Sequence, residues 1–101
     1  MIYRRAGCFK TAYDLLPKEM QAKAVKAFEL FKENPRHPSL VIKKVKGTED
    51  NIWEGRIDQF YRFTFQYLDN LNYDPRNDDE SKKTICLFRN IGRHEIVDIA
   101  P

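Results

Sequence analysis

The stretch from Ile52 to Tyr67 alternates between apolar and polar side chains at the period of two that a β-strand imposes. In its first half, Trp53 and Ile57 fall on one face of the predicted strand. Glu54 and Arg56 fall on the other face. We therefore expect one side of this strand to meet a core and the other side to carry charge.

The second half of this stretch repeats the alternation, with aromatic residues opposite polar ones. A turn at Asp58-Gln59 between two adjacent antiparallel strands would bring Glu54, Arg56 and Arg62 onto one surface, because neighbouring strands lie only about 5 Å apart. The pattern thus predicts a patch with one carboxylate and two guanidinium groups. The aromatic residues that we assign to the core rather than to base stacking are Trp53, Tyr61, Phe63 and Phe65.

Two helices are predicted ahead of this hairpin. Residues 8–16 have the apolar spacing of a short amphipathic helix. Pro17 interrupts that helix and is itself favoured at a first helical position, so Pro17–Glu33 is predicted as a longer second helix that Asn34-Pro35 ends. Its expected buried stripe is Met20, Ala24, Phe28 (or Ala27) and Phe31.

The remaining segments predict strands and turns. Residues 2–6 suit a short edge strand, and residues 40–46 suit a further strand closed by Gly47. Residues 48–51 are predicted as a turn. Residues 84–91 are apolar on both faces, as in a central strand covered by helices on one side. The Gly92–His94 segment is expected to break that strand, and a short strand or turn to follow.

Lysines cluster on the strand predicted at residues 40–46. Lys44 and Lys46 share one face, and Lys43 lies on the other. A pair of cations two residues apart suits contact with a phosphate backbone. Lysines on an edge strand also serve to prevent aggregation, and both interpretations stay open here.

Composition restricts the classes of protein to which the chain can belong. Its 101 residues, of which 42% are hydrophobic, suffice for one domain, residues 1–101, with one small core. No apolar run of about 18 residues and no apolar leader after Met1 is present, so we expect a cytoplasmic protein without a membrane partner. Two histidines and two cysteines without metal-ligand spacing predict neither a metal nor a cofactor. We expect Cys8 and Cys86 both to be buried.

The charges are unevenly distributed. Residues 69–80 contain five acidic residues against Arg76, a net charge of −4, so the overall +3 leaves +7 on the rest of the chain. We interpret residues 69–82 as an acidic loop insertion at a hairpin tip. The basic remainder suits an acidic partner such as nucleic acid or an acidic protein segment, and equally a solvated basic face.

These elements predict an α+β fold: two N-terminal helices packed on one face of a twisted antiparallel sheet of about four strands, with the other face basic and partly open. The order helix, Leu-Pro, long helix, Asn-Pro, then Glu-x-Arg-Ile-x-x-x-Tyr-Arg-x-x-Phe, then Ile-Gly-x-His-Glu resembles the RelE/ParE superfamily of toxins from type II toxin–antitoxin modules. The resemblance covers nearly the whole chain apart from the acidic insertion.

This resemblance implies two activities on one fold. RelE-like members are metal-independent endoribonucleases, usually cutting mRNA at the ribosome, whereas ParE-like members act against DNA gyrase without being nucleases. A third hypothesis is a non-toxic module that only binds an antitoxin-like partner. The implied partners are a cognate antitoxin and RNA, in particular ribosome-bound mRNA, with gyrase as the alternative target.

Metal-free RNA cleavage needs a base, cations around the phosphate and an acid. Glu54 is the candidate base, Arg56 and Arg62 the candidate phosphate clamp, and His94 the candidate acid. The alternative is structural, with Glu54 in a surface ion pair and His94 bonded to backbone at the strand end. The family's C-terminal tyrosine is missing, since none follows Tyr73. Candidate RNA-binding residues are Lys43, Lys44, Lys46 and Arg93.

Overall fold

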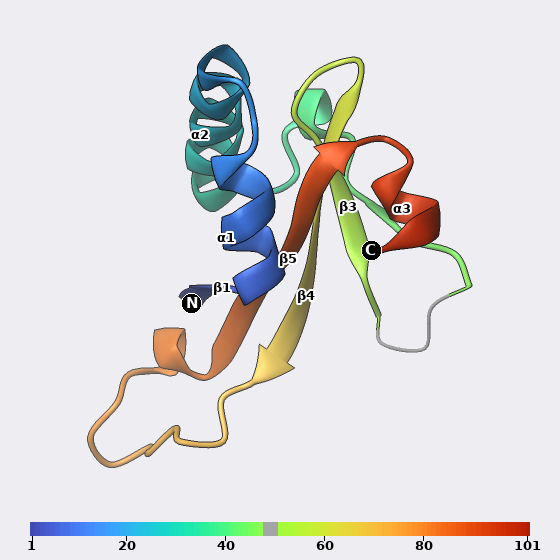
Figure 1. Cartoon of the computed structure of the whole chain (residues 1–101). Helices are drawn as coiled ribbons and strands as arrows, with labels where there is room; N and C mark the ends of the chain where they lie inside the picture. Colours follow the sequence, from blue (N-terminus) through green and yellow to red (C-terminus); the bar gives the residue numbers. More distant parts are fainter. Residues whose placement is uncertain (48–50) are drawn as a thin grey trace.

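The computed structural model describes residues 1–47 and 51–101, so most of the turn predicted at residues 48–51 lies outside the described residues. Within the described ranges the α-helices are α1 (Gly7–Asp14), α2 (Lys18–Glu33) and α3 (Ile96–Ile99). The strands are β1 (Ile2–Arg5), β2 (Lys43–Lys44), β3 (Trp53–Arg56), β4 (Tyr61–Asp69) and β5 (Thr84–Arg93) (Figure 1). No helix among these residues is long and apolar enough to cross a membrane.

The strands of the described residues form one five-stranded sheet in the order β1-β5-β4-β3-β2. β1 runs parallel to β5, whereas the other neighbours are antiparallel. The predicted antiparallel sheet of about four strands is therefore wrong in this detail, because the sheet is mixed. The chain leaves β1 through α1 and α2, and this crossover brings β1 to the far edge in parallel orientation. A period-two pattern indicates a strand, but it does not determine whether the strand runs parallel or antiparallel to its neighbours.

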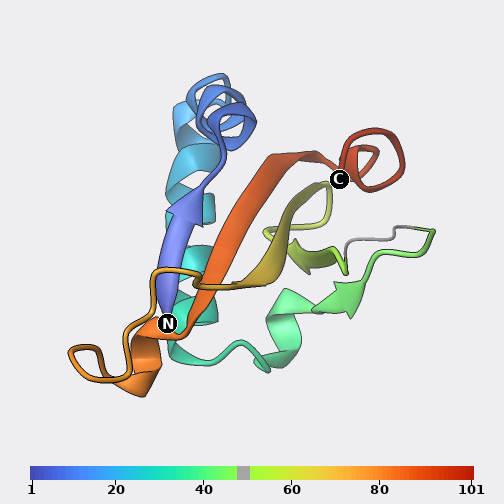
Figure 2. The same cartoon turned by 90° about the horizontal axis from the view of Figure 1, so that it is seen from below.

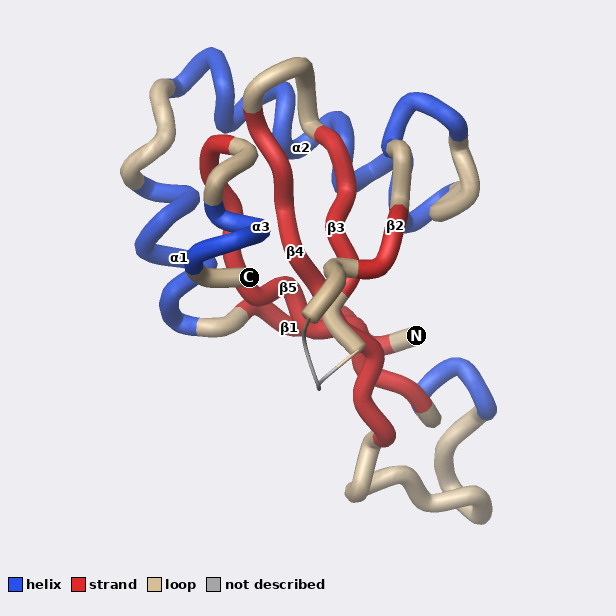
Figure 3. Tube along the Cα trace, turned by 90° about the vertical axis from the view of Figure 1, so that its right-hand side faces the viewer, coloured by secondary structure: helices blue, strands red, loops and turns tan. Residues whose placement is uncertain are grey.

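The two N-terminal helices are present close to their predicted ends. They lie on one face of the sheet, and α3 lies on the opposite face (Figures 2 and 3). Ala24, Ala27 and Phe31 are the buried residues of α2, while Phe28 is partly buried. Of the two alternatives for the stripe, Ala27 is thus the more buried.

Aromatic rings form the core between α2 and the sheet. Phe63 and Phe65 on β4 and Phe88 on β5 are buried. Phe31 packs on Phe65 with ring centroids 4.7 Å apart, and Phe28 meets the Phe63 ring edge-on at 5.2 Å. Offset and edge-on contacts are the favoured geometries of aromatic pairs. The core assignment of Phe63 and Phe65 is confirmed.

The strand predicted at residues 40–46 is mostly wrong. Residues 38–40 form a 3₁₀ turn, for which His37 Nδ1 accepts a hydrogen bond from the Ser39 N–H at 3.2 Å. Val41 then adopts φ 44°, in the left-handed region that a β-branched residue rarely enters. After this reversal, Lys43 and Lys44 pair with β3, and the Val45 N–H donates to Ile52 O at 2.8 Å.

Gly92 does not break β5, which continues to Arg93. A Cβ atom at Gly92 would lie 2.9 Å from Ile96 Cγ2, so the glycine allows α3 to approach the strand. The end of the chain is a short helix rather than the predicted strand or turn. Its last carbonyls accept hydrogen bonds from the sheet, with Thr64 Oγ1 3.1 Å from Pro101 O and Asn90 Nδ2 2.7 Å from Ala100 O.

The acidic segment forms the connection between β4 and β5 and projects from the body (Figures 1 and 3). Two hydrogen bonds close its base: Asn70 Nδ2 to Lys82 O at 2.8 Å and Asn70 N to Lys83 O at 2.9 Å. Within it, Asp74 accepts from the Arg76 N–H at 2.9 Å. The segment is thus shaped by its own polar side chains.

The two cysteines differ, so the expectation that both are buried is wrong for Cys8. Cys8 is exposed on α1, and its thiol donates to Arg89 O at 2.9 Å. Cys86 is fully buried, and burial raises its pKa to about 12 although Lys32 acts in the opposite direction. The thiolate of Cys86 is therefore not formed near neutral pH.

Gly55→Ala should lower the free energy of unfolding by about 1–3 kcal/mol. The new Cβ would collide with the Phe63 ring and lie 2.9 Å from Ile42 Cδ1. Gly7→Ala is the matched control, because a Cβ there meets nothing within 4 Å. Urea denaturation of both variants measures the difference. Equal stability of the two would contradict the close packing over Gly55.

A thiol-reactive aromatic disulfide should label one cysteine quickly in the folded protein and both in denaturant, because only a thiolate reacts. The fast-reacting residue should be Cys8, so Cys8→Ser should abolish native labelling. Rapid labelling of Cys86 in the folded state would mean that the core around it opens readily.

Candidate functional site

The β3–β4 hairpin brings two of the three predicted charged residues, Glu54 and Arg62, to one hollow. Arg56 lies opposite Arg62, and Glu54 lies opposite Thr64. Cross-strand partners point to the same side of a sheet. Lys43 on β2 is in turn the partner of Glu54. The side of β2, β3 and β4 that faces away from α1 and α2 therefore carries a carboxylate among cations.

A hollow of about 450 Å³ opens on this surface. We call it the basic hollow, and it is lined by Lys43, Lys44, Val45, Lys46, Glu54, Arg62, His94, Val97 and Asp98. It unites three of the four candidate catalytic residues with three of the four candidate RNA-binding residues. Strands β2, β3 and β4 supply one wall, and the segment from the end of β5 into α3 supplies the other.

Glu54 lies deep in the basic hollow and is 7% exposed. Its Oε1 lies 3.7 Å from Lys43 Nζ, whose side chain is largely exposed. A nearly buried carboxylate needs a cation to offset its lost hydration. The expected surface pair is thus present, but its acidic member is buried rather than on the surface.

Arg62 is held by the hairpin turn. Its Nη1 donates to Asp58 O at 2.7 Å and to Tyr61 O at 3.0 Å. A guanidinium has five N–H groups, so these two bonds leave those on Nε and Nη2 for other partners. The bonds fix the side chain at the wall of the hollow without using up its capacity to hold a phosphate.

Asp58 builds the turn that holds Arg62. Its Oδ1 accepts from the N–H groups of Phe60 and Tyr61, each at 2.9 Å, and its Oδ2 lies 3.6 Å from Lys23 Nζ on α2. Burial alone would raise the pKa of Asp58, but the two backbone N–H donors and Lys23 together lower it below its usual value. The ionised carboxylate thus joins the turn to the helix layer.

His94 sits where β5 gives way to α3. Its backbone N–H donates to Phe60 O at 2.8 Å, so the main chain rather than the ring makes the bond at the strand end. The imidazole is 58% exposed, with Nε2 3.6 Å from Glu95 Oε1. The ring is accessible at the edge of the basic hollow.

Two candidate residues lie outside the basic hollow. Arg56 ends β3 and lines a separate hollow beside α2, together with Lys23 and Lys26. Arg93 is the cross-strand partner of Tyr61 and covers the rings of Phe60 and Tyr61 at 5.4 and 5.9 Å. These contacts with rings hold the Arg93 guanidinium by cation–π attraction.

Sequence analysis did not identify the two residues that α3 contributes to the wall of the basic hollow. Val97 and Asp98 line the hollow from α3, because residues 96–99 form a helix where a strand or turn was expected. The available signal was that Asp98 follows His94 by four residues, because side chains four residues apart lie on one side of a helix. Among residues 1–47 and 51–101 no group of three or more His, Cys, Asp or Glu could hold a metal ion.

Searches of protein-family models and of curated proteins find no match. Solved structures do match. YafQ from E. coli strain BL21(DE3) is 11% identical, with a TM-score of 0.67 and 94% of each chain covered. A YoeB/ParE toxin from Agrobacterium tumefaciens is 14% identical, with a TM-score of 0.66 and 93% of this chain and 99% of that chain covered. The archaeal RelE–RelB complex from Pyrococcus horikoshii OT3 is 15% identical, with a TM-score of 0.61 and coverage of 91% and 92%. The chain has the fold of these RelE/ParE-type toxins.

Asp58→Ala should lower the free energy of unfolding by about 1–2 kcal/mol at neutral pH, because two backbone donors lose their acceptor. Asp58→Asn retains an amide oxygen for these donors and should cost less. The pKa of Asp58 is lowered in the folded state, so its charge stabilises the fold above the unfolded pKa of about 3.9. That stabilisation is lost as the pH falls through the folded pKa. Urea denaturation across this range should show the gap between wild type and Asp58→Asn closing toward low pH, and a constant gap would contradict this account.

Proposed function

We propose that this chain is the toxin of a toxin–antitoxin module and that it cleaves mRNA as a metal-independent endoribonuclease. One observation carries the proposal: Glu54, Arg62 and His94 line a single hollow with Lys43, Lys44 and Lys46. The fold shared with the YoeB/ParE toxin from Agrobacterium tumefaciens supports the same class of function. A carboxylate, an imidazole and clustered cations are the groups that metal-free phosphodiester cleavage requires.

The chemistry is an attack of a ribose 2′-hydroxyl on the adjacent phosphorus. Glu54 removes the 2′-OH proton as the new oxygen–phosphorus bond forms. His94, in its protonated form, donates a proton to the 5′-oxygen as the bond between that oxygen and phosphorus breaks. The products are a 2′,3′-cyclic phosphate and a free 5′-hydroxyl, so protons and charges balance.

Cations of the basic hollow hold the phosphate and offset the charge that grows on it. Arg62 supplies its Nε and Nη2 donors from a position fixed by Asp58 O and Tyr61 O. Lys44 and Lys46 contact the flanking phosphates of a single-stranded substrate. An entering phosphate also competes with Glu54 for Lys43, and loss of this ion pair frees the carboxylate to accept a proton.

The proposed substrate is mRNA bound to the ribosome, and the proposed partner is a cognate antitoxin. The Pyrococcus horikoshii structure is a RelE–RelB complex. The basic body of the chain suits an acidic antitoxin segment as well as RNA. The proposed location is therefore the cytoplasm.

Induced expression in a bacterial host should arrest growth and create new RNA 5′ ends. Glu54→Gln and His94→Ala should each reduce cleavage by about 10²- to 10⁴-fold, the usual contribution of a general base or acid. Sequencing of RNA 5′ ends measures the loss in cells. Purified toxin with free RNA and a chelator tests separately whether the cleavage step needs a metal or the ribosome.

Glu33→Gln is the matched control, because Glu33 is exposed at the end of α2 and does not line the hollow. It should cleave at the wild-type rate. Growth arrest by the wild type with intact RNA and with DNA breaks would exclude the nuclease activity and support gyrase inhibition. No arrest at all would leave a module that only binds its partner.

A further inference from the structure

A larger hollow of about 620 Å³ lies between β1, α1 and α2, on the side of the sheet away from the basic hollow. We call it the aromatic groove. Its floor is built from Tyr3, Phe9, Phe28 and Phe88, whose rings contact one another at centroid distances of 5.1–6.2 Å. Tyr3 and Phe28 are only partly buried, so the floor can still receive an apolar side chain.

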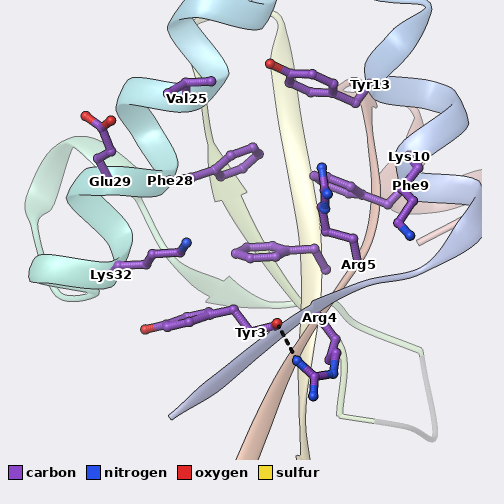
Figure 4. A pocket seen from close by; sticks show the side chains of 11 residues that line it. Tyr3, Arg4, Arg5, Phe9, Lys10, Tyr13, Val25, Phe28, Glu29 and Lys32 are labelled. Carbon is purple, nitrogen blue, oxygen red and sulfur yellow. Dashed lines mark hydrogen bonds between the residues drawn. The ribbon is translucent and has the colours of Figure 1, made fainter.

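The rim of the aromatic groove is basic. Lys32 and Glu29 come from the α2 side, and Arg5 and Lys10 come from the opposite side (Figure 4). Arg4 extends the positive rim along β1. Glu29 is the single acid among the described lining residues, so the groove combines an apolar floor with a net positive edge. A matching ligand has an apolar side chain flanked by carboxylates.

The connection between β4 and β5 has these properties. Leu71 is 94% exposed and stands among the acids that give residues 69–80 their net charge of −4. Leu68 and Tyr67 on the adjoining strand are also exposed. Leu71 therefore offers an exposed apolar side chain flanked by carboxylates.

The loop does not reach its own groove. No residue of 69–83 lines the groove in the described chain, and the hydrogen bonds from Asn70 to Lys82 and Lys83 hold the base of the loop. The loop leaves the body beside the start of β1 (Figures 1 and 2), where Ile2 pairs with Ile85. The loop and the β1 edge of the aromatic groove therefore lie at the same end of the molecule.

We propose that the aromatic groove binds the acidic β4–β5 loop of a second copy of this chain, so that two copies form a reciprocal two-fold dimer. Leu71 enters the groove, and the carboxylates of the loop face the cations of the rim. Both halves of the contact are present on one chain, which favours a second copy over another acidic partner. Reciprocity doubles the buried surface, and the basic hollow on the opposite side of the sheet stays open.

Sedimentation equilibrium of the full chain should show a monomer–dimer equilibrium that weakens with added salt. Leu71→Asp should raise the dimer dissociation constant about tenfold or more. Leu15→Asp is the matched control, since Leu15 is 80% exposed and lies in neither the groove nor the loop. It should leave the constant unchanged, and thermal denaturation verifies that both variants fold.

Charge reversal gives the sharper test. A groove variant, Arg4→Glu with Arg5→Glu, turns the net charge of the rim negative. A loop variant, Asp69→Lys with Asn72→Lys and Glu80→Lys, turns the net charge of residues 69–80 positive. Each variant should be monomeric alone. Mixed together they should form a heterodimer, because both of its loop–groove contacts again join opposite charges.

A wild-type chain that stays monomeric at low salt, or a dimer unaffected by Leu71→Asp and by both reversals, would overturn the proposal. The proposal would also be overturned if the wild-type chain is monomeric and the groove variant loses binding to an acidic antitoxin. These outcomes do not depend on RNA cleavage, so the proposed nuclease and the proposed dimer can fail separately.

Discussion

The packing of Phe63, Phe65 and Phe88 against Phe31 of α2 is the interaction on which the rest of the molecule depends. These rings lie on one face of β4 and β5, and that face forms part of the core. Because side chains alternate along a strand, the opposite face must then carry Arg62 and its neighbours. The chemistry of the polar face is therefore a consequence of where the aromatic residues stand.

The polar face is shaped by hydrogen bonds rather than by apolar packing. Thr64 and Asn90 bond to the carbonyls of Pro101 and Ala100, and so hold the segment that follows α3 against the sheet. This attachment supports one wall of the basic hollow, while the Asp58 turn positions Arg62 in the other. The basic hollow contains more cations than acids. The cations repel one another, and a bound polyanion lowers this repulsion.

Sequence patterns sufficed for elements with a clear period. The α2 stripe and the β3–β4 hairpin followed from spacings of about 3.6 and 2, and the hairpin alone brings Glu54 and Arg62 together. Other features depend on contacts distant in the sequence. The direction of β1 depends on the crossover through the helices. Arg56 stands at the end of β3 and lines a hollow beside α2, which the alternation of side chains along the strand did not predict. Residues 96–99, Ile-Val-Asp-Ile, fit a strand or a helical turn equally well until they pack over Gly92.

The pairing of β1 with β5 has a consequence for how the protein is made. β1 leaves the ribosome first, but its partner strand is translated after every other strand of the sheet. The sheet edge therefore stays open until nearly the whole chain has emerged, and contacts of such long sequence separation slow folding. His94, Val97 and Asp98 follow later still. In a nascent chain the residues of the two N-terminal helices are therefore present long before those that complete the basic hollow.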